Sequence, residues 1–220
     1  MISFNNISKS FTQGSKKIDV RKDINFELDE EGLIALVGKS GSGKSTFLSL
    51  LAGLDSPDSG NIVLGEETLT SLSESELTQF RAQNIGIIFQ SFNLVNNFTA
   101  LENVLLPLEV LKADNAMEKA KQMLSKVGLS DRMNHFPSQL SGGECQRVAI
   151  ARATVTNPKI ILADEPSGNL DPETGERVMD ILFKTAKDLD QTLILVTHDM
   201  ELAKKCDAVY EIKNHKVDLV

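Results

Sequence analysis

A glycine-rich loop between an apolar strand and an apolar helix places the strongest constraint on this chain. The run GLIALVG at 32–38 predicts a buried strand, and FLSLLAG at 47–53 predicts the helix that follows. Residues 38–46 read GKSGSGKST and fit the pattern G-x-x-x-x-G-K-[ST] in the strand–loop–helix context that it requires. Glycines let such a loop wrap a phosphate chain with its N–H groups inward, and the positive end of the helix favours the anion. The sequence therefore predicts a nucleotide phosphate site.

The residue types in this loop indicate how it would hold a nucleotide. Lys44 is expected to bind the β- and γ-phosphates, and Ser45 to coordinate Mg²⁺. The alternative to a phosphate site is a flexible glycine–serine turn. The nucleotide contacts predicted here are Gly38, Lys39, Ser40, Gly41, Ser42, Gly43, Lys44, Ser45 and Thr46.

Apolar runs alternate with helical stretches along the rest of the chain. Further buried strands are predicted at 84–90, 159–166 and 192–199, and helices at 73–83, 115–128 and 172–189. This alternation predicts an α/β fold with a largely parallel sheet. Antiparallel strands with short turns are predicted in the first 30 residues, at 61–69 and at 208–217.

Composition limits the partners and the compartment. The 220 residues carry a formal net charge of −8, which argues against nucleic acid as a partner. The two cysteines, Cys145 and Cys206, are far apart with no CxxC partner, which fits a reduced compartment. No signal-peptide core and no run of 18 apolar residues is present, so we expect a cytosolic chain that does not itself span a membrane.

Polar side chains follow three of the predicted strands. Asp164 and Glu165 end ILADE, Gln90 ends IGIIFQ, and His198 ends LILVTH. Open parallel sheets bind ligands at this edge, so Asp164 and Gln90 are candidate Mg²⁺ contacts, and Glu165 is the candidate general base for the attacking water. His198 is a candidate γ-phosphate contact. A solvated strand cap and a structural histidine are the plain alternatives.

The stretch LSGGECQ at 140–146 predicts a second anion site. Ser141 and Glu144 match the S-x-x-E capping box, so a helix should begin near residue 142. Gly142 and Gly143 would let a phosphate approach the free N–H groups of the first turn. An ordinary capped helix that binds nothing is the alternative.

LSGGECQ resembles the signature motif of ATP-binding cassette (ABC) ATPases. Gln90 resembles the Q-loop of that family, SGNLD at 167–171 its D-loop, and His198 its switch histidine. The resemblance covers almost the whole chain, and it implies a single ATP-binding domain with a RecA-like core, an N-terminal antiparallel β subdomain and an inserted helical subdomain. The implied boundaries are 1–90 and 156–220 for the core with its antiparallel strands, and 91–155 for the helical subdomain with the signature.

The family resemblance also implies a dimer and further contacts. The signature of one subunit closes over ATP held by the phosphate loop of the other, in a head-to-tail homodimer or a pseudo-symmetric heterodimer. Phe11 matches an aromatic position that stacks on adenine, with a core phenylalanine as the alternative. Asp171 is expected to reach across the dimer or to cap the helix that starts at Pro172. Cys145 stands where glutamine is usual, so one hydrogen-bonding side chain is missing near the nucleotide edge; we expect the capping box and the glycines to carry the contact and the cysteine to be tolerated.

The segment at 69–111, which contains Gln90, indicates the subgroup of ABC ATPases. It resembles the group of lipoprotein-releasing (LolD-type), macrolide-exporting (MacB-type) and division-associated (FtsE-type) ATPases, and polar amino-acid importers carry a similar stretch. This resemblance implies a separate permease that docks near 91–110, with the chain held at the cytoplasmic side of the inner membrane. Chromosome ATPases would need a long coiled-coil insertion, and translation-factor ATPases a second phosphate loop; the sequence shows neither.

Overall fold

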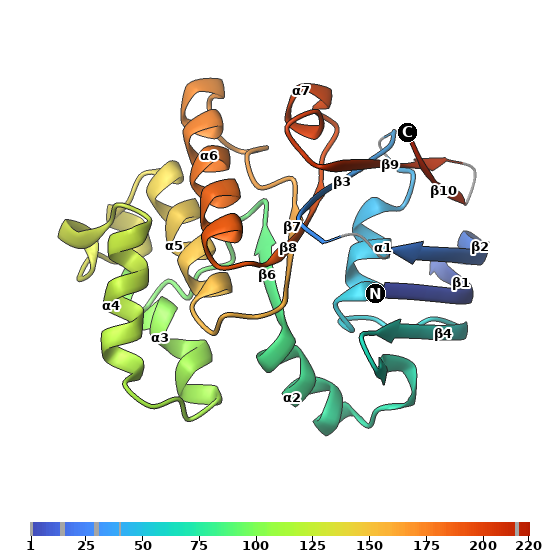
Figure 1. Cartoon of the computed structure of the whole chain (residues 1–220), viewed down its shortest axis with the longest axis horizontal. Coiled ribbons are helices and arrows are strands. Elements are labelled where there is room, and N and C mark those ends of the chain that lie inside the picture. Colours follow the sequence, from blue (N-terminus) through green and yellow to red (C-terminus); the bar gives the residue numbers. More distant parts are fainter. Residues whose placement is uncertain (1, 14–15, 29–30, 40, 214–215) are drawn as a thin grey trace. The chain divides into compact units, whose positions relative to one another are not determined.

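The computed structural model describes residues 2–13, 16–28, 31–39, 41–213 and 216–220, with backbone only for residues 11–23 and 216. Its described part divides into two compact units. The first contains residues 1–81 and 194–220, and the second contains residues 82–193. Figure 1 shows the helices and strands along the chain.

The first unit contains an antiparallel sheet in the order β2-β1-β4-β5. Its strands are β1 (Ile2–Gln13), β2 (Lys16–Leu28), β4 (Ser59–Leu64) and β5 (Glu67–Thr68). Phe4 pairs with Phe26 across β1 and β2, and both side chains are buried. The ring of Phe4 stacks on Phe47 of α1 (Lys44–Leu51), with centroids 4.4 Å apart. The sheet is therefore packed directly against the helix that follows the glycine-rich loop.

The first unit contains three further strands, and one of them, β3, leads directly into that loop. In this unit β3 (Leu33–Val37) pairs in parallel with β9 (Ala208–Lys213), and β9 pairs antiparallel with β10 (Lys216–Leu219). All five residues of β3 are buried, as expected for an apolar strand with neighbours on both edges. The 3-10 helix η1 (Leu69–Ser71) and the helices α2 (Glu74–Asn84) and α7 (Met200–Ala203) complete the unit, whose boundary falls in the last turn of α2.

The second unit places helices around a pair of parallel strands. β6 (Ile85–Phe89) pairs with β7 (Ile160–Asp164) in the register that sets Phe89 opposite Asp164. The helices α3 (Ala100–Val110), α4 (Ala116–Lys126) and α6 (Pro172–Asp188) all pack on α5 (Gly142–Thr154). Short 3-10 helices η2 (Ser130–Arg132) and η3 (Pro137–Gln139) join α4 to α5, and β8 (Thr192–Val196) begins here and ends in the first unit.

Most of the predicted elements are confirmed to within two or three residues at each end. The helix expected to begin near residue 142 begins at Gly142, and that expected at 172–189 spans Pro172–Asp188. The antiparallel strands with a short turn that are expected at 61–69 are β4 and β5, and Gly65, with a φ of 65°, turns the chain back on itself between them.

Candidate functional site

The glycine-rich loop curls over the first turn of α1 in the first unit. The ammonium group of Lys44 donates to the carbonyl oxygens of Gly38, at 2.8 Å, and Lys39, at 3.1 Å, and the residue is 6% exposed. Gly43 caps the helix with a φ of 84°, a conformation that glycine adopts without steric cost. A charged lysine is thus held inside the loop beside the helix N-terminus, where its charge and the helix dipole both attract an anion.

The first residue of the loop is a glycine because other atoms of the chain lie too close to it for a side chain to fit. A Cβ atom at Gly38 would lie 2.7 Å from the carbonyl oxygen of Ile212 and 2.8 Å from Oγ of Ser42. Ser45 is exposed in the first turn of α1 and Thr46 is half-buried, so both can face a ligand. Ser40 lies outside the described residues. The remaining loop residues occupy the positions that the sequence predicts between β3 and α1.

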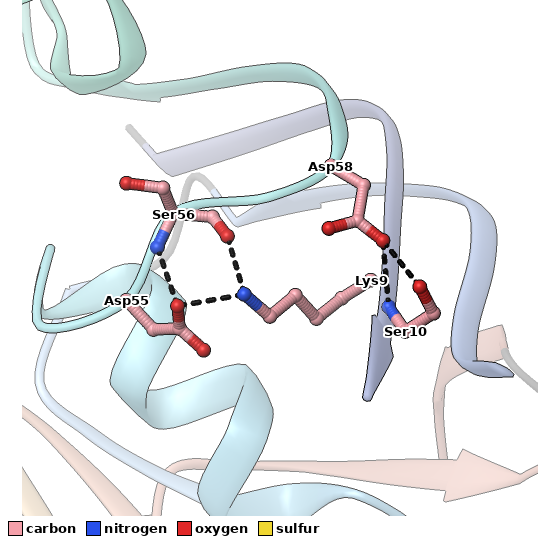
Figure 2. A network of polar contacts seen from close by, with 5 residues as sticks. All are labelled: Lys9, Ser10, Asp55, Ser56 and Asp58. Atoms are coloured by element: carbon pink, nitrogen blue, oxygen red, sulfur yellow. Dashed lines mark hydrogen bonds and ion pairs between the residues drawn. The ribbon is translucent and has the colours of Figure 1, made fainter. Parts of the chain in front are cut away.

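A polar network joins the second half of β1 to the segment that follows α1 (Figure 2). The ammonium group of Lys9 lies 2.7 Å from Oδ1 of Asp55 and donates to the carbonyl oxygen of Ser56. Ser10 donates from both N and Oγ to one carboxylate oxygen of Asp58, at 2.9 and 2.6 Å. This network fixes the strand just before Phe11, the predicted adenine contact, relative to the phosphate-loop helix. The side chain of Phe11 lies outside the described residues.

His198 also belongs to the first unit. It follows β8 and is exposed. The preceding residue, Thr197, donates from its backbone N–H to the carbonyl oxygen of Leu36 in β3. His198 therefore leaves the sheet beside the strand that leads into the glycine-rich loop.

The second unit brings the predicted acidic edge together. Because Phe89 is opposite Asp164, Gln90 and Glu165 leave the sheet at the same edge. Both Asp164 and Glu165 are half-buried. Glu165 has a φ of 44°, a left-handed conformation that is rare outside glycine and typical of strained functional positions. The carboxylate of Glu165 is thus on a strained turn directly after a buried strand.

The signature segment forms the capping box that the sequence predicts. The hydroxyl of Ser141 accepts from the N–H of Glu144 at 3.3 Å, and the carboxylate of Glu144 accepts from the N–H of Ser141 at 2.8 Å. Arg132 donates to the other carboxylate oxygen of Glu144 at 3.0 Å. These hydrogen bonds lower the pKa of Glu144, most strongly through the backbone N–H of Ser141, against an opposing effect of burial. The helix N-terminus is therefore held in a fixed shape.

The two signature glycines are also needed for packing. A Cβ atom at Gly143 would collide with the methyl group of Thr174 on α6, and one at Gly142 would lie 3.1 Å from Leu170. The sequence predicts only that these glycines let a phosphate approach the N–H groups at the helix N-terminus. Cys145 is 7% exposed and its Sγ contacts the carbonyl oxygen of Pro137 at 3.6 Å. Burial, followed by the charge of Glu144, raises the pKa of this thiol.

Three further residues of the second unit, which are not among the predicted site residues, form hydrogen bonds to the Q-loop or to residues next to it. Gln146, fully buried on α5, donates to the carbonyl oxygen of Phe89 at 3.4 Å. Arg152, one turn and a half further along, donates to the carbonyl oxygens of Phe92 and Asn93. Asn169 pairs with Gln90. The sequence signal for Arg152 was weak: a single charge in the small, apolar run VAIARAT.

The side chains expected to hold a divalent cation suit Mg²⁺. Ser45, Gln90 and Asp164 offer a hydroxyl, an amide oxygen and a carboxylate, the hard oxygen ligands that Mg²⁺ prefers. Gln90 and Asp164 come together at the edge fixed by the Phe89–Asp164 pair. Among the described residues, no group of three His, Cys, Asp or Glu side chains could hold a metal ion.

The chain matches the ABC transporter family over residues 21–168. It is 45% identical over 214 residues to the lipoprotein-releasing system ATP-binding protein LolD of Treponema denticola, covering 96% of this chain and 95% of that one. The corresponding protein of Idiomarina loihiensis is 44% identical, with 94% and 92% covered.

The solved structures to which this chain is similar are also ATP-binding cassettes. A dimeric ATP-binding cassette in a post-hydrolysis state with ADP and Pi is 38% identical, with a TM-score of 0.89, and 99% of this chain and 96% of that chain are covered. A second dimeric cassette, 39% identical, has the same TM-score and the same coverage. No helix in the described part of the chain has the length and apolar character to cross a membrane. The chain belongs to the ABC transporter family and is one of its ATP-binding, ATP-hydrolysing proteins.

Proposed function

We propose that this chain is the ATPase subunit of a transporter that releases lipoproteins from a membrane. The observation that carries this proposal is the 45% identity to a lipoprotein-releasing system ATP-binding protein over nearly the full length of both chains. The same likeness favours lipoprotein release over drug or peptide efflux, cell division and amino-acid import. Its ATPase activity would close and reopen a dimer, since ATP bridges two subunits better than ADP does.

In this proposal the first unit holds the nucleotide. Lys44 binds the β- and γ-phosphate oxygens, and the N–H groups of the loop at 38–46 surround them. His198 contacts the γ-phosphate from the strand beside the loop. Phe11 stacks on the adenine ring. The network of Lys9 and Ser10 with Asp55 and Asp58 supports this assignment, because it fixes the strand end before Phe11 against the helix of the phosphate loop (Figure 2).

The second unit supplies the group that activates water. Glu165 accepts a proton from the attacking water, and its strained turn holds the carboxylate at the strand edge. Ser45, Gln90 and Asp164 would hold Mg²⁺ directly or through its bound water. When bound, the ion would supply positive charge that offsets the charge developing on the phosphate oxygens.

Two copies of the chain would share each nucleotide. The N-terminus of α5 presents the N–H groups of Gly142 and Gly143 to the γ-phosphate of ATP bound by the other copy, beside the capping box of Ser141 and Glu144. The dimeric cassettes to which the chain is similar support this arrangement. The capping box supports it further, because it holds the helix end in one conformation before any anion arrives.

A separate membrane permease would dock near residues 91–110. In that segment Val95 and Phe98 are 39% and 37% exposed, although both are large apolar side chains. The fully buried amide of Asn103 holds the backbone that carries them. An ordered loop with exposed apolar side chains suits a protein partner. Through it the chain would lie at the cytoplasmic side of the inner membrane.

A Glu165→Gln variant tests the hydrolytic part of the proposal. It keeps the shape of the side chain but cannot take a proton, so turnover should fall about 10²–10⁴-fold while ATP binding persists. The variant should then accumulate as an ATP-bound dimer, detectable by light scattering. Glu173→Gln, on the exposed start of α6, is the matched control and should keep normal turnover. Near-normal turnover in Glu165→Gln would reject Glu165 as the base.

A pull-down tests the transport part. The chain should co-purify from detergent-solubilised membranes with a permease that has a large domain outside the cytosol, and reconstitution of the pair should release a lipoprotein when ATP is added. A compact importer permease in its place would reject lipoprotein release and leave the ATPase assignment intact.

A further inference from the structure

Gln90 and Asn169 are joined by two amide hydrogen bonds although they are 79 positions apart in the sequence. Nε2 of Gln90 donates to Oδ1 of Asn169 at 3.2 Å. Nδ2 of Asn169 donates to the main-chain oxygen of Gln90 at 3.0 Å. Gln90 directly follows β6, and Asn169 lies in the turn that follows β7, so the parallel pairing of these strands brings the two side chains together.

This pair fixes which atom of the Gln90 amide faces outward. A main-chain carbonyl can only accept a hydrogen bond, so Asn169 must present Nδ2 to Gln90 O. Oδ1 of Asn169 then faces the Gln90 side chain, and an oxygen can be met only by Nε2. Oε1 of Gln90 is therefore the atom directed away from Asn169. Only an amide oxygen can coordinate a cation, so the pair selects the orientation that binds metal.

Gly168 makes room for the same arrangement. A Cβ atom at Gly168 would lie 2.6 Å from Nε2 and 3.1 Å from Cδ of Gln90. The N–H of Gly168 also donates to the carbonyl oxygen of Glu165 at 2.9 Å. The turn that carries Asn169 thus starts at the candidate base and ends against the candidate metal ligand.

We propose that Asn169 is a positioning residue, which holds the Gln90 side chain with Oε1 turned toward Mg²⁺ and links that ligand to the turn of Glu165. This inference rests on the proposed function, in which Gln90 is a ligand of the ion or of its bound water. Asn169 itself touches neither the nucleotide nor the ion. Without it the Gln90 amide can rotate and offer Nε2, which repels a cation.

Mn²⁺ binding provides the test, because it does not depend on turnover. The full chain, in excess over a non-hydrolysable ATP analogue, is titrated with Mn²⁺ and followed by electron paramagnetic resonance. Asn169→Ala should lower the Mn²⁺ affinity roughly tenfold, as is typical for a partner that orients a metal ligand. Gly168→Ala, which pushes on the same amide, should lower it as well. Gln122→Ala removes an exposed amide that is hydrogen-bonded to Glu118 in the same unit, and should leave the affinity unchanged.

A double-mutant comparison separates positioning from general disruption. If Asn169 acts through Gln90, then Gln90→Ala with Asn169→Ala should bind Mn²⁺ as weakly as Gln90→Ala alone. Additive losses would overturn the proposal, as would an Asn169→Ala variant within twofold of the unaltered chain while Gln90→Ala is weak. If Gln90→Ala itself binds Mn²⁺ normally, the assignment of Gln90 as a metal ligand also fails. Unchanged melting temperatures show that each variant is folded.

Discussion

The guanidinium of Arg152 on α5 lies 2.7 Å from the carbonyl oxygen of Asn93 and 3.0 Å from that of Phe92. Phe92 and Asn93 both have positive φ angles, 61° and 49°, which turn two successive carbonyls toward the same side. The planar fork of arginine matches such a pair of acceptors. Burial lowers the pKa of Arg152, yet an arginine keeps its charge in a protein. The helix that begins with the signature is therefore tied to the segment that follows the Q-loop.

Removing this guanidinium should loosen the segment at 90–95. Arg152→Ala leaves the partly buried carbonyl of Phe92 and the exposed carbonyl of Asn93 without their charged donor, and the free energy of unfolding should fall by about 2 kcal/mol. Arg152→Lys should lose about half as much, because a single ammonium group replaces the fork. Urea unfolding measures both changes. Arg177→Ala, which breaks an exposed ion pair with Glu173, should change stability by less than about 0.5 kcal/mol. If Arg152→Ala and Arg177→Ala are equally stable, the hydrogen bonds of the Arg152 guanidinium do not contribute to the free energy of unfolding.

Gly143→Ala should destabilise the chain through packing alone. The added methyl group collides with the methyl group of Thr174, and overpacking of this kind costs about 1–3 kcal/mol. Thermal unfolding should show the loss. Thr174→Ser removes the opposing methyl group but keeps a hydroxyl, so Gly143→Ala combined with Thr174→Ser should recover most of the stability.

The same pair of variants distinguishes two uses of the glycine. If Gly143 also allows a phosphate to approach the helix, the stabilised double variant should still hydrolyse ATP slowly, because its methyl group remains at the helix N-terminus. Full recovery of both stability and turnover would assign Gly143 to packing only.

Features encoded within a few neighbouring residues could be predicted from the sequence. The capping box of Ser141 and Glu144 needs only four residues, and the strand before Gly38 is apolar throughout, so local pattern was enough for both. The edge that collects Gln90 and Glu165 followed from a general property of parallel sheets.

Contacts between distant segments could not be predicted in this way. Asn169 meets Gln90 only because β6 and β7 pair in one register, and a shift of that register would separate them. The burial of Cys145 depends on how η3 packs against α5, which no pattern within LSGGECQ reveals. The side chain that faces Gly143 comes from α6, 31 positions further on.

The capping box should make stability depend on pH below neutrality. Hydrogen bonds from Ser141 and the ion pair with Arg132 lower the pKa of Glu144 in the folded chain relative to its ordinary value. A carboxyl whose pKa is lowered by folding stabilises fully above its unfolded pKa, and this contribution is lost as the pH falls through the folded pKa. Unfolding free energy should therefore decline as the medium becomes acidic.

Glu144→Gln isolates this contribution. The glutamine amide can still accept from the N–H of Ser141 but does not titrate, so the variant should be less stable than the unaltered chain at pH 7 and lose less stability on acidification. Urea unfolding between pH 7 and pH 3 compares the two slopes. Parallel curves would show that Glu144 contributes no measurable pH dependence.

The buried amide of Asn103 should control the loop proposed to meet the permease. Its Oδ1 accepts from the N–H of Val95 at 2.8 Å, and its Nδ2 donates to the carbonyl oxygens of Val95 and Phe98, both at 3.1 Å. Asn103→Asp keeps the acceptor but places a carboxylate against these carbonyls, where it cannot donate. We expect a loss of at least about 2 kcal/mol of unfolding free energy and faster proteolysis between residues 95 and 99. Asn103→Ala should lose less, because it introduces no charge.

Measurements of ATPase activity distinguish a role of this loop in contact with the permease from a role at the ATP site. A loosened loop should reduce the stimulation of ATPase activity by the reconstituted permease more than the basal activity of the chain alone. Asn97→Ala removes an exposed amide from the same loop and should change neither stability nor proteolysis. If Asn103→Asp is as stable and as protease-resistant as Asn97→Ala, the amide does not hold the loop. If basal and stimulated activity fall by the same factor, the loop acts on the ATP site itself and not through the permease.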